Sequence, residues 1–190
     1  ILRNHEWNEG EPWSYRQYNN YVIARKKSPP QKIKKASYLD ISRLLNPQFL
    51  QLGYQRILGF GENAIPLKID GNANELEGRM VSADVHGMLN GIFQYAREAK
   101  ESGEAEPITM SYEVSFDRTL TLTVNLRATK PVRRKGKDIT EGTIEEILKQ
   151  SVVEELKKEN IEYSFINHGN GRKSYIFKMP LFDKSALSLL

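Results

Sequence analysis

Residues 108–128 read ITMSYEVSFDRTLTLTVNLRA, and their pattern is the strongest structural signal in the chain. On both sides of the short polar sequence Asp117-Arg118, apolar residues alternate with threonine, serine and other polar residues. Alternation with a period of two, rich in β-branched and aromatic side chains, predicts two paired strands with one buried face. Because an isolated hairpin is marginal in water, apolar side chains from elsewhere in the chain must cover that face.

Two amphipathic helices are expected to provide this cover. One follows Asp84, a candidate N-cap, and the other begins near residues 140–143 and runs to about residue 159. A strand is predicted at residues 65–69, and a second hairpin at residues 162–181 around the turn His168-Gly169-Asn170-Gly171. This order predicts an α+β fold, a two-layer α/β sandwich with a mixed, mostly antiparallel sheet and helices on one face.

Composition narrows the classes of function. The 190 residues carry a net charge of +4 and no cysteine, which excludes disulfides and cysteine metal sites and favours a cytoplasmic protein. No apolar run approaches the length of a membrane span, so no membrane partner is expected. No nucleophile or metal motif occurs, and the three histidines are dispersed. We therefore expect no catalytic residue, metal or cofactor, and His86 is interpreted as a surface or capping residue.

Residues 1–37 lack helical or strand periodicity and are predicted to be an extended arm, followed by a single α/β domain at residues 38–190. The aromatic residues of the arm are Trp7, Trp13, Tyr15, Tyr18 and Tyr21. Its basic residues near Pro29-Pro30 are Arg25, Lys26, Lys27, Lys32, Lys34 and Lys35. The arm is interpreted as a solvated linker with docked aromatic rings, a nucleic-acid-binding arm, or a segment that orders on a partner.

A second basic run occupies residues 130–137, and its proline and glycine predict a loop. Its candidate nucleic-acid-binding residues are Arg133, Arg134, Lys135 and Lys137. The two basic runs form either one positive face or two separate solvated loops.

Three stretches in this order resemble a known family. They are DVHGMLNGIFQYAREA at residues 84–99, the hairpin at 108–128, and GNGRKSYIFKMPL at 169–181. Over residues 64–182 the chain resembles the ATP-binding domain of the GHKL superfamily, which includes sensor histidine kinases, Hsp90-type chaperones and MutL-type proteins. The resemblance implies that an asparagine on the first helix holds magnesium and that an Asp-x-Gly-x-Gly motif after the hairpin binds adenine.

The chain departs from this family at both positions. Asn90 matches the first asparagine of the helix motif, but Tyr95 occupies the magnesium-ligand position, and a phenol is a poor magnesium ligand. Residues 125–129, Asn-Leu-Arg-Ala-Thr, replace the adenine motif, and the basic run replaces the glycine-rich lid. The resemblance therefore implies a GHKL-like fold whose nucleotide site has been dismantled.

Three functions remain open at this point. The first is a non-catalytic binding or regulatory module that contacts another protein chain or a second copy, and it predicts an exposed apolar patch on the helices of residues 39–58. The second is a nucleic-acid-binding domain that uses the arm and the basic loop. The third is an active ATPase with an unusual nucleotide site.

Overall fold

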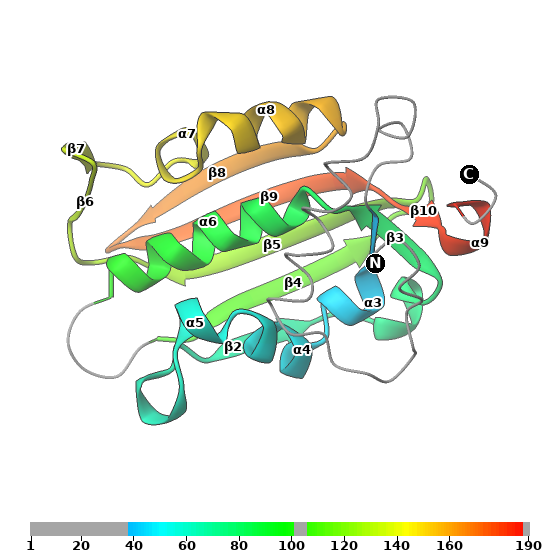
Figure 1. Ribbon diagram of the computed structural model, residues 1–190, viewed down its shortest axis with the longest axis horizontal. Helices are drawn as coiled ribbons and strands as arrows, with labels where there is room; N and C mark the ends of the chain where they lie inside the picture. Colours follow the sequence, from blue (N-terminus) through cyan, green and yellow to red (C-terminus); the bar gives the residue numbers. More distant parts are fainter. Residues whose placement is uncertain (1–37, 101–105, 188–190) are drawn as a thin grey trace, which may run out of the picture.

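The computed structural model describes residues 38–100 and 106–187 (Figure 1). The predicted arm, with all its aromatic and basic candidates, lies outside the described residues. Within the described part, five strands form the main sheet in the order β2-β4-β5-β9-β8. These strands are β2 (Leu67–Asp70), β4 (Ile108–Val114), β5 (Thr119–Arg127), β8 (Glu162–Gly169) and β9 (Arg172–Pro180). Only β2 and β4 run parallel, so the predicted mixed, mostly antiparallel sheet is confirmed.

The predicted central hairpin is β4 and β5, with Tyr112 opposite Leu122. The apolar residues of β5 are buried and its threonines are half-buried, as the alternation predicts. Phe116 differs from its apolar neighbours in the pattern because it lies in the turn and is fully exposed. The alternation extends two residues beyond the last paired residue of β4, Val114, and no residue of β5 pairs with Phe116.

Helices α6 (Val85–Glu98), α7 (Ile144–Ile147) and α8 (Gln150–Lys158) lie over one face of the sheet (Figure 1). The second predicted helix is therefore two helices, because the backbone is extended at Leu148 and Lys149. The final hairpin turns at Asn170-Gly171, where both residues have positive φ, as an Asn-Gly hairpin turn requires. Among the helices of residues 38–100 and 106–187, none combines the length and apolar character needed to cross a bilayer.

A small second sheet joins the two ends of the described chain. Strand β3 (Arg79–Ser82) lies between β1 (Tyr38–Asp40) and β10 (Phe182–Asp183) and pairs antiparallel with both. The rings of Tyr38 and Phe182 meet edge-on, with centroids 5.0 Å apart. None of these three strands is predicted from the sequence, because each is too short to show a period.

The remaining elements are short. They are α3 (Ile41–Leu44), α4 (Pro47–Gly53), α5 (Gln55–Leu58), the 3-10 turns Gly61–Asn63 and Ala73–Leu76, β6 (Val132–Arg134), β7 (Lys137–Ile139) and α9 (Lys184–Leu187). Strands β6 and β7 pair with each other as a separate hairpin, where the sequence predicts a loop.

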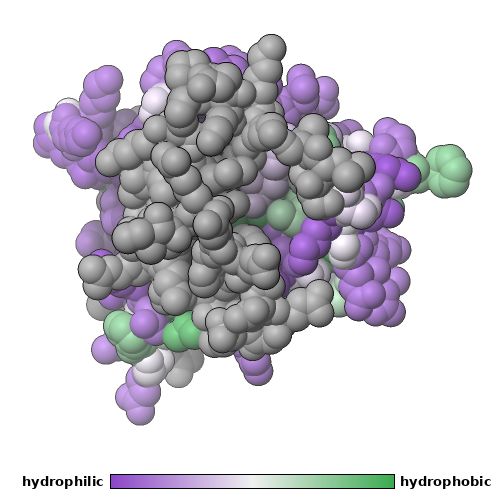
Figure 2. All heavy atoms as spheres, turned by 45° about the vertical axis from the view of Figure 1, so that its right-hand side comes forward, coloured by the Kyte–Doolittle hydropathy of each residue, from purple (hydrophilic) through white to green (hydrophobic). Residues whose placement is uncertain are grey.

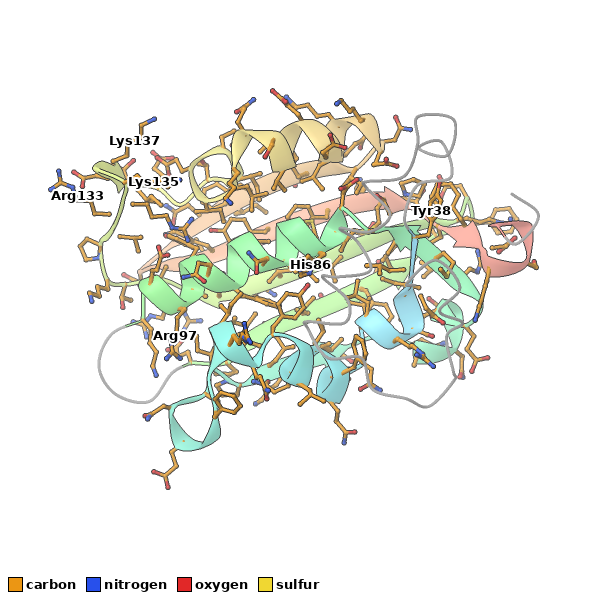
Figure 3. The ribbon with its side chains drawn as sticks, viewed as in Figure 1. Tyr38, His86, Arg97, Arg133, Lys135 and Lys137 are labelled. Carbon is orange, nitrogen blue, oxygen red and sulfur yellow. The ribbon has the colours of Figure 1, made fainter. Side chains whose placement is uncertain are left out.

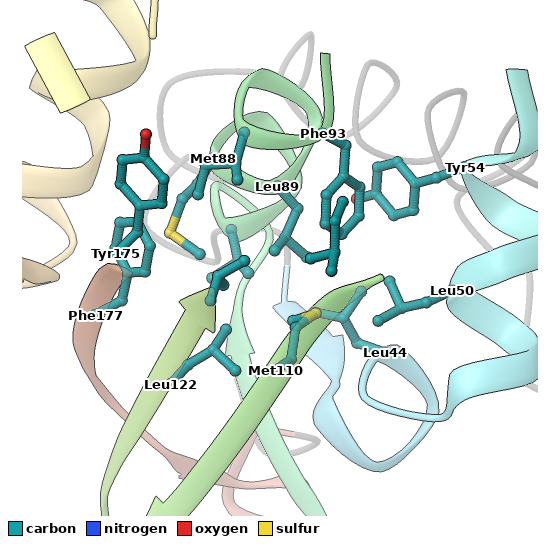
Figure 4. Close-up of a cluster of buried hydrophobic side chains, with 14 of the residues drawn as sticks. Leu44, Leu50, Tyr54, Met88, Leu89, Phe93, Met110, Leu122, Tyr175 and Phe177 are labelled. Carbon is teal, nitrogen blue, oxygen red and sulfur yellow. The ribbon is translucent and has the colours of Figure 1, made fainter. Parts of the chain in front are cut away.

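The core lies between the sheet and α6, and the segment α3–α5 extends it to one side of that helix (Figure 4). The predicted exposed patch on residues 39–58 is wrong, because Leu44, Leu50 and most other apolar residues there are buried. The prediction for His86 is also wrong. Its ring is only 8% exposed, and Nδ1 lies 2.8 Å from the Tyr54 hydroxyl. Both errors have one cause, since α3–α5 covers a side of α6 that the helical period alone assigns to solvent.

Candidate functional site

The candidate site is the junction of α6, the first turn of α7 and β9. This junction includes Tyr95 on α6, which the sequence resemblance places at the position of the family's magnesium ligand. At its centre is the turn at Gly142, just before α7. Side chains from α6, α7 and β9 contact this turn: Tyr95, Glu146 and Tyr175 respectively.

Gly142 is held from two sides. Its φ of +73° is in the left-handed region, and a Cβ at this position would lie only 2.4 Å from the Tyr95 hydroxyl oxygen. The Tyr175 hydroxyl donates a hydrogen bond to the Gly142 carbonyl oxygen at 2.6 Å, and Tyr175 is completely buried. Tyr95 and the side chain of Lys173, whose Cε would lie 3.0 Å from the same Cβ, therefore fill the space beside the turn, and only a glycine fits there.

The Glu146 carboxylate binds the backbone in front of α7. Its Oε2 accepts hydrogen bonds from the N–H groups of Gly142 at 2.7 Å and of Glu141 and Thr143 at 3.2 Å. Its Oε1 accepts one from the Thr140 hydroxyl at 3.0 Å. Thr143 and Glu146 thus form a capping box. Free N–H groups at a helix N-terminus bind anions, and here the chain's own carboxylate takes that place.

These hydrogen bonds set the protonation of the junction. Partial burial opposes the ionisation of Glu146, but the hydrogen bonds from Gly142, Thr140, Thr143 and Glu141 outweigh it and lower its pKa. Burial raises the pKa of Tyr95, and the nearby Glu146 carboxylate adds to the effect. Burial likewise raises the pKa of Tyr175. At neutral pH the Glu146 carboxylate is therefore charged, and the phenols of Tyr95 and Tyr175 are neutral.

Arg134 connects the β6–β7 hairpin to this junction. Its Nε forms an ion pair with Glu98 Oε2 at 2.5 Å, and its Nη1 donates to the Ile147 carbonyl oxygen at 2.8 Å. Glu98 ends α6 and Ile147 ends α7, so one guanidinium joins three elements. Its Nη2 is buried and has no hydrogen-bond partner among the described residues.

The candidate nucleic-acid residues of the basic run are therefore separated. Arg133, Lys135 and Lys137 are exposed at the end of the β6–β7 hairpin (Figure 3), whereas Arg134 is turned towards α6 and α7. Whether this hairpin joins the basic residues of the arm lies outside the described residues.

Sequence reasoning missed Glu146, Tyr175 and Gly142. The signal for Glu146 was present, because Thr143-Ile-Glu-Glu146 has the spacing of a capping box. Tyr175 was assigned only to a strand, and nothing in the sequence indicates that its hydroxyl reaches a turn 33 residues away. Within the part of the chain that the structure describes, no group of three or more histidine, aspartate or glutamate side chains is arranged to hold a metal.

Comparisons with known proteins give matches in structure but not in sequence. No protein-family model and no curated protein sequence matches the chain. Several solved histidine kinases are similar to it in structure. A blue-light activated histidine kinase from Erythrobacter litoralis gives a TM-score of 0.45 at 15% identity over 74% of this chain. A separate structure of its histidine kinase domain gives 0.43 at 16% identity over 70%.

The mycobacterial sensor histidine kinase MprB gives a TM-score of 0.48 at 7% identity, covering 78% of this chain and 99% of that structure. This chain spans 43% of the full Erythrobacter kinase and 62% of its kinase domain. With every one of these TM-scores below 0.5, the likeness concerns the general arrangement of helices and strands.

Proposed function

We propose that this chain is a non-catalytic binding or regulatory module with a GHKL-like fold, which does not bind nucleotide and acts through contacts with another protein. The observation that carries this proposal is the Glu146 carboxylate, which accepts hydrogen bonds from three successive backbone N–H groups in front of α7. Nucleotide phosphates need such donors. In this chain the donors already have an anionic partner.

The neighbouring groups support the same conclusion. A phosphate at this position would have to displace Glu146, whose carboxylate would then lie beside it as a like charge. Tyr95 fills the space beside Gly142, and Tyr175 donates a hydrogen bond to the Gly142 carbonyl oxygen. Neither phenol is a ligand that magnesium prefers. The contacts at the junction therefore stabilise the fold and do not bind a ligand.

An exposed aromatic residue on an ordered turn supports the proposal that this chain acts through contacts with another protein. Large apolar side chains are exposed singly at Leu52, Phe60, Phe116 and Ile166, and the face in Figure 2 is mainly hydrophilic outside the grey atoms. Phe116 is the most exposed of the four. Its turn is fixed by the Arg118 N–H donating to the Ser115 carbonyl at 3.1 Å and by a hydrogen bond from the Ser115 hydroxyl to Asp117. An aromatic side chain on an ordered turn requires little backbone ordering on docking, and aromatic residues are typical anchors of protein interfaces.

Thermal unfolding with and without millimolar magnesium-ATP tests the proposal that the chain does not bind nucleotide. We expect no shift in Tm. A ligand at 100 times its Kd would stabilise the folded state by about 2.7 kcal/mol, so a clear rise in Tm would overturn the proposal. Glu146→Ala is the informative variant. If magnesium-ATP stabilised this variant and not the unaltered chain, the carboxylate would be identified as the group that excludes phosphate.

Sedimentation velocity from low to high micromolar concentration tests whether the protein partner is a second copy. We expect self-association that Phe116→Ser weakens and that Phe60→Ser, a matched loss of an exposed phenylalanine, leaves unchanged. Equal effects of the two substitutions would remove Phe116 from the interface. A sedimentation coefficient independent of concentration would exclude the second copy and leave a different chain as the partner.

A further inference from the structure

The outer surface of the β6–β7 hairpin is mainly cationic, with Asp138 as its one acidic side chain. Arg133, Lys135 and Lys137 are exposed at its end, and Lys130 is exposed just before β6. The strands are joined by the two residues Lys135 and Gly136, whose φ values of +49° and +77° are those of a tight hairpin turn. Figures 1 and 3 show the hairpin at one end of the molecule, with the three labelled cations pointing away from the helices and the sheet.

The base of this hairpin is fixed to the body of the molecule. Val132 is buried and Ile139 packs against the core. The Lys130 N–H donates to the Ala99 carbonyl oxygen at 3.2 Å, and Arg134 holds Glu98 and the Ile147 carbonyl. The cations therefore stand on a short, anchored ribbon, and little backbone ordering is required when they meet a partner.

We propose that this hairpin binds the phosphate backbone of double-stranded DNA. Lysine and arginine side chains neutralise phosphates, and a two-stranded β-ribbon has a width that the major groove of B-form DNA admits. The one acidic side chain in residues 130–139 is Asp138, whose carboxylate lies 3.7 Å from the Arg133 guanidinium. This exposed pair is weak, and Lys130, Lys135 and Lys137 form no ion pair with any other residue that the structure describes.

The composition of the surface favours DNA over a protein partner. Of the exposed residues in 130–139, Pro131 is the one apolar side chain. Protein interfaces have cores rich in aromatic residues and poor in lysine, which is the opposite composition. A single strand is also disfavoured, because residues 130–139 hold no aromatic ring on which an unpaired base could stack. A-form RNA is disfavoured because its major groove is too deep and narrow for side chains to read.

Fluorescence anisotropy with a labelled DNA duplex of mixed sequence, measured on the full chain at several salt concentrations, tests the inference. We expect binding at low salt that weakens steeply as salt rises. The test variant is Lys135→Glu with Lys137→Glu. Its control is Lys157→Glu with Lys158→Glu on α8, which makes the same change in net charge at two lysines that are equally exposed.

Loss of two phosphate contacts should reduce the slope of log K against log salt by about 1.8. The control variant should keep the slope of the unaltered chain. Comparing the two variants within the full chain cancels any contribution from the basic arm. Near-ultraviolet circular dichroism shows that both variants keep the fold, which is expected because all four lysines are exposed.

Every other outcome overturns the inference. No binding by the unaltered chain at low salt would make the cations incidental, and equal losses in the two variants would assign binding to net charge. Tighter binding to single-stranded DNA or to duplex RNA would show that the hairpin does not bind the major groove of B-form DNA. If polyglutamate displaced the labelled duplex as effectively as unlabelled duplex of equal charge, the partner would be an acidic protein. None of these results bears on the nucleotide junction, so this inference and the proposed function can fail separately.

Discussion

Arg134 and its neighbours in the β6–β7 hairpin belong to one basic run but have opposite surroundings. The Arg134 guanidinium is half-buried, ion-paired with Glu98 and bound to the end of α7, whereas Arg133, Lys135 and Lys137 face solvent. Alternation along β6 separates Arg133 from Arg134, because successive side chains of a strand point to opposite faces. Lys137 pairs with Arg134 and is exposed because it lies next to the turn of the hairpin. A count of charges in a sequence therefore overestimates the number that a partner can reach.

Two glycines differ in the same way, one enclosed and one exposed: Gly142 before α7 and Gly136 in the turn of the β6–β7 hairpin. Gly142 and Gly136 have nearly the same φ, +73° and +77°, but only Gly142 is enclosed. Gly136→Ala should cost about 1 kcal/mol from its backbone conformation alone. Gly142→Ala should cost about 3 kcal/mol, because its Cβ would also collide with the Tyr95 hydroxyl. Urea unfolding of the two variants measures the difference. Equal costs would mean that Tyr95 moves aside freely and that the junction is loosely packed.

Substitution of the two arginines should give the next largest difference. Arg134→Ala leaves Glu98 without its cation and the Ile147 carbonyl without its donor, so we expect a loss of about 2 kcal/mol in unfolding free energy. Arg133→Ala removes only the exposed pair with Asp138 and should change stability by less than about 0.5 kcal/mol.

A double-mutant cycle of Arg134→Ala with Glu98→Ala separates the ion pair from the bond to Ile147. The Glu98 carboxylate is shared by no other cation among the described ion pairs, so the coupling energy should be positive and should account for part of the loss. A stability of Arg134→Ala equal to that of Arg133→Ala would show that the inner arginine does not anchor the hairpin.

Acid unfolding should reveal the smallest effect. The folded-state pKa of Glu146 is lowered, so its stabilising contribution is complete above the ordinary glutamate pKa of about 4.3 and is lost as pH falls through the folded-state value. Glu146→Ala removes the capping hydrogen bonds and should cost about 1 kcal/mol at pH 7. The difference between the variant and the unaltered chain should shrink below pH 4. A difference that stayed constant from neutral to acid pH would mean that the hydrogen bonds do not require the charge.

The main sheet and the faces of its strands were predictable because the signals are local. The alternation in residues 108–128 assigns Leu120, Leu122 and Val124 to the core, and Asn170-Gly171 marks a turn that needs two positive φ values. The order of α6 and the five strands of the main sheet also follows from local patterns, since each of these elements is identified from its own residues.

The junction could not be derived in the same way, because its contacts join distant parts of the chain. Tyr175 reaches Gly142, and Arg134 reaches Glu98 on a helix that ends more than thirty residues earlier. His86 illustrates the same limit, since its burial depends on Tyr54 from another helix. Helical periodicity describes one buried side and gives no information on a second layer of covering residues.

The small β1-β3-β10 sheet has a mechanical consequence. Because β1 and β10 pair with opposite edges of β3, Tyr38 and Asp183 lie on the two sides of one short strand. A load applied through these two points falls first on the three pairings of β1 and the two pairings of β10 with β3, while the longer β5–β9 pairing carries none of it directly. Tension should therefore detach β1 and β10 in a first, low-force step that leaves the five-stranded sheet, the Gly142 junction and the cationic hairpin intact.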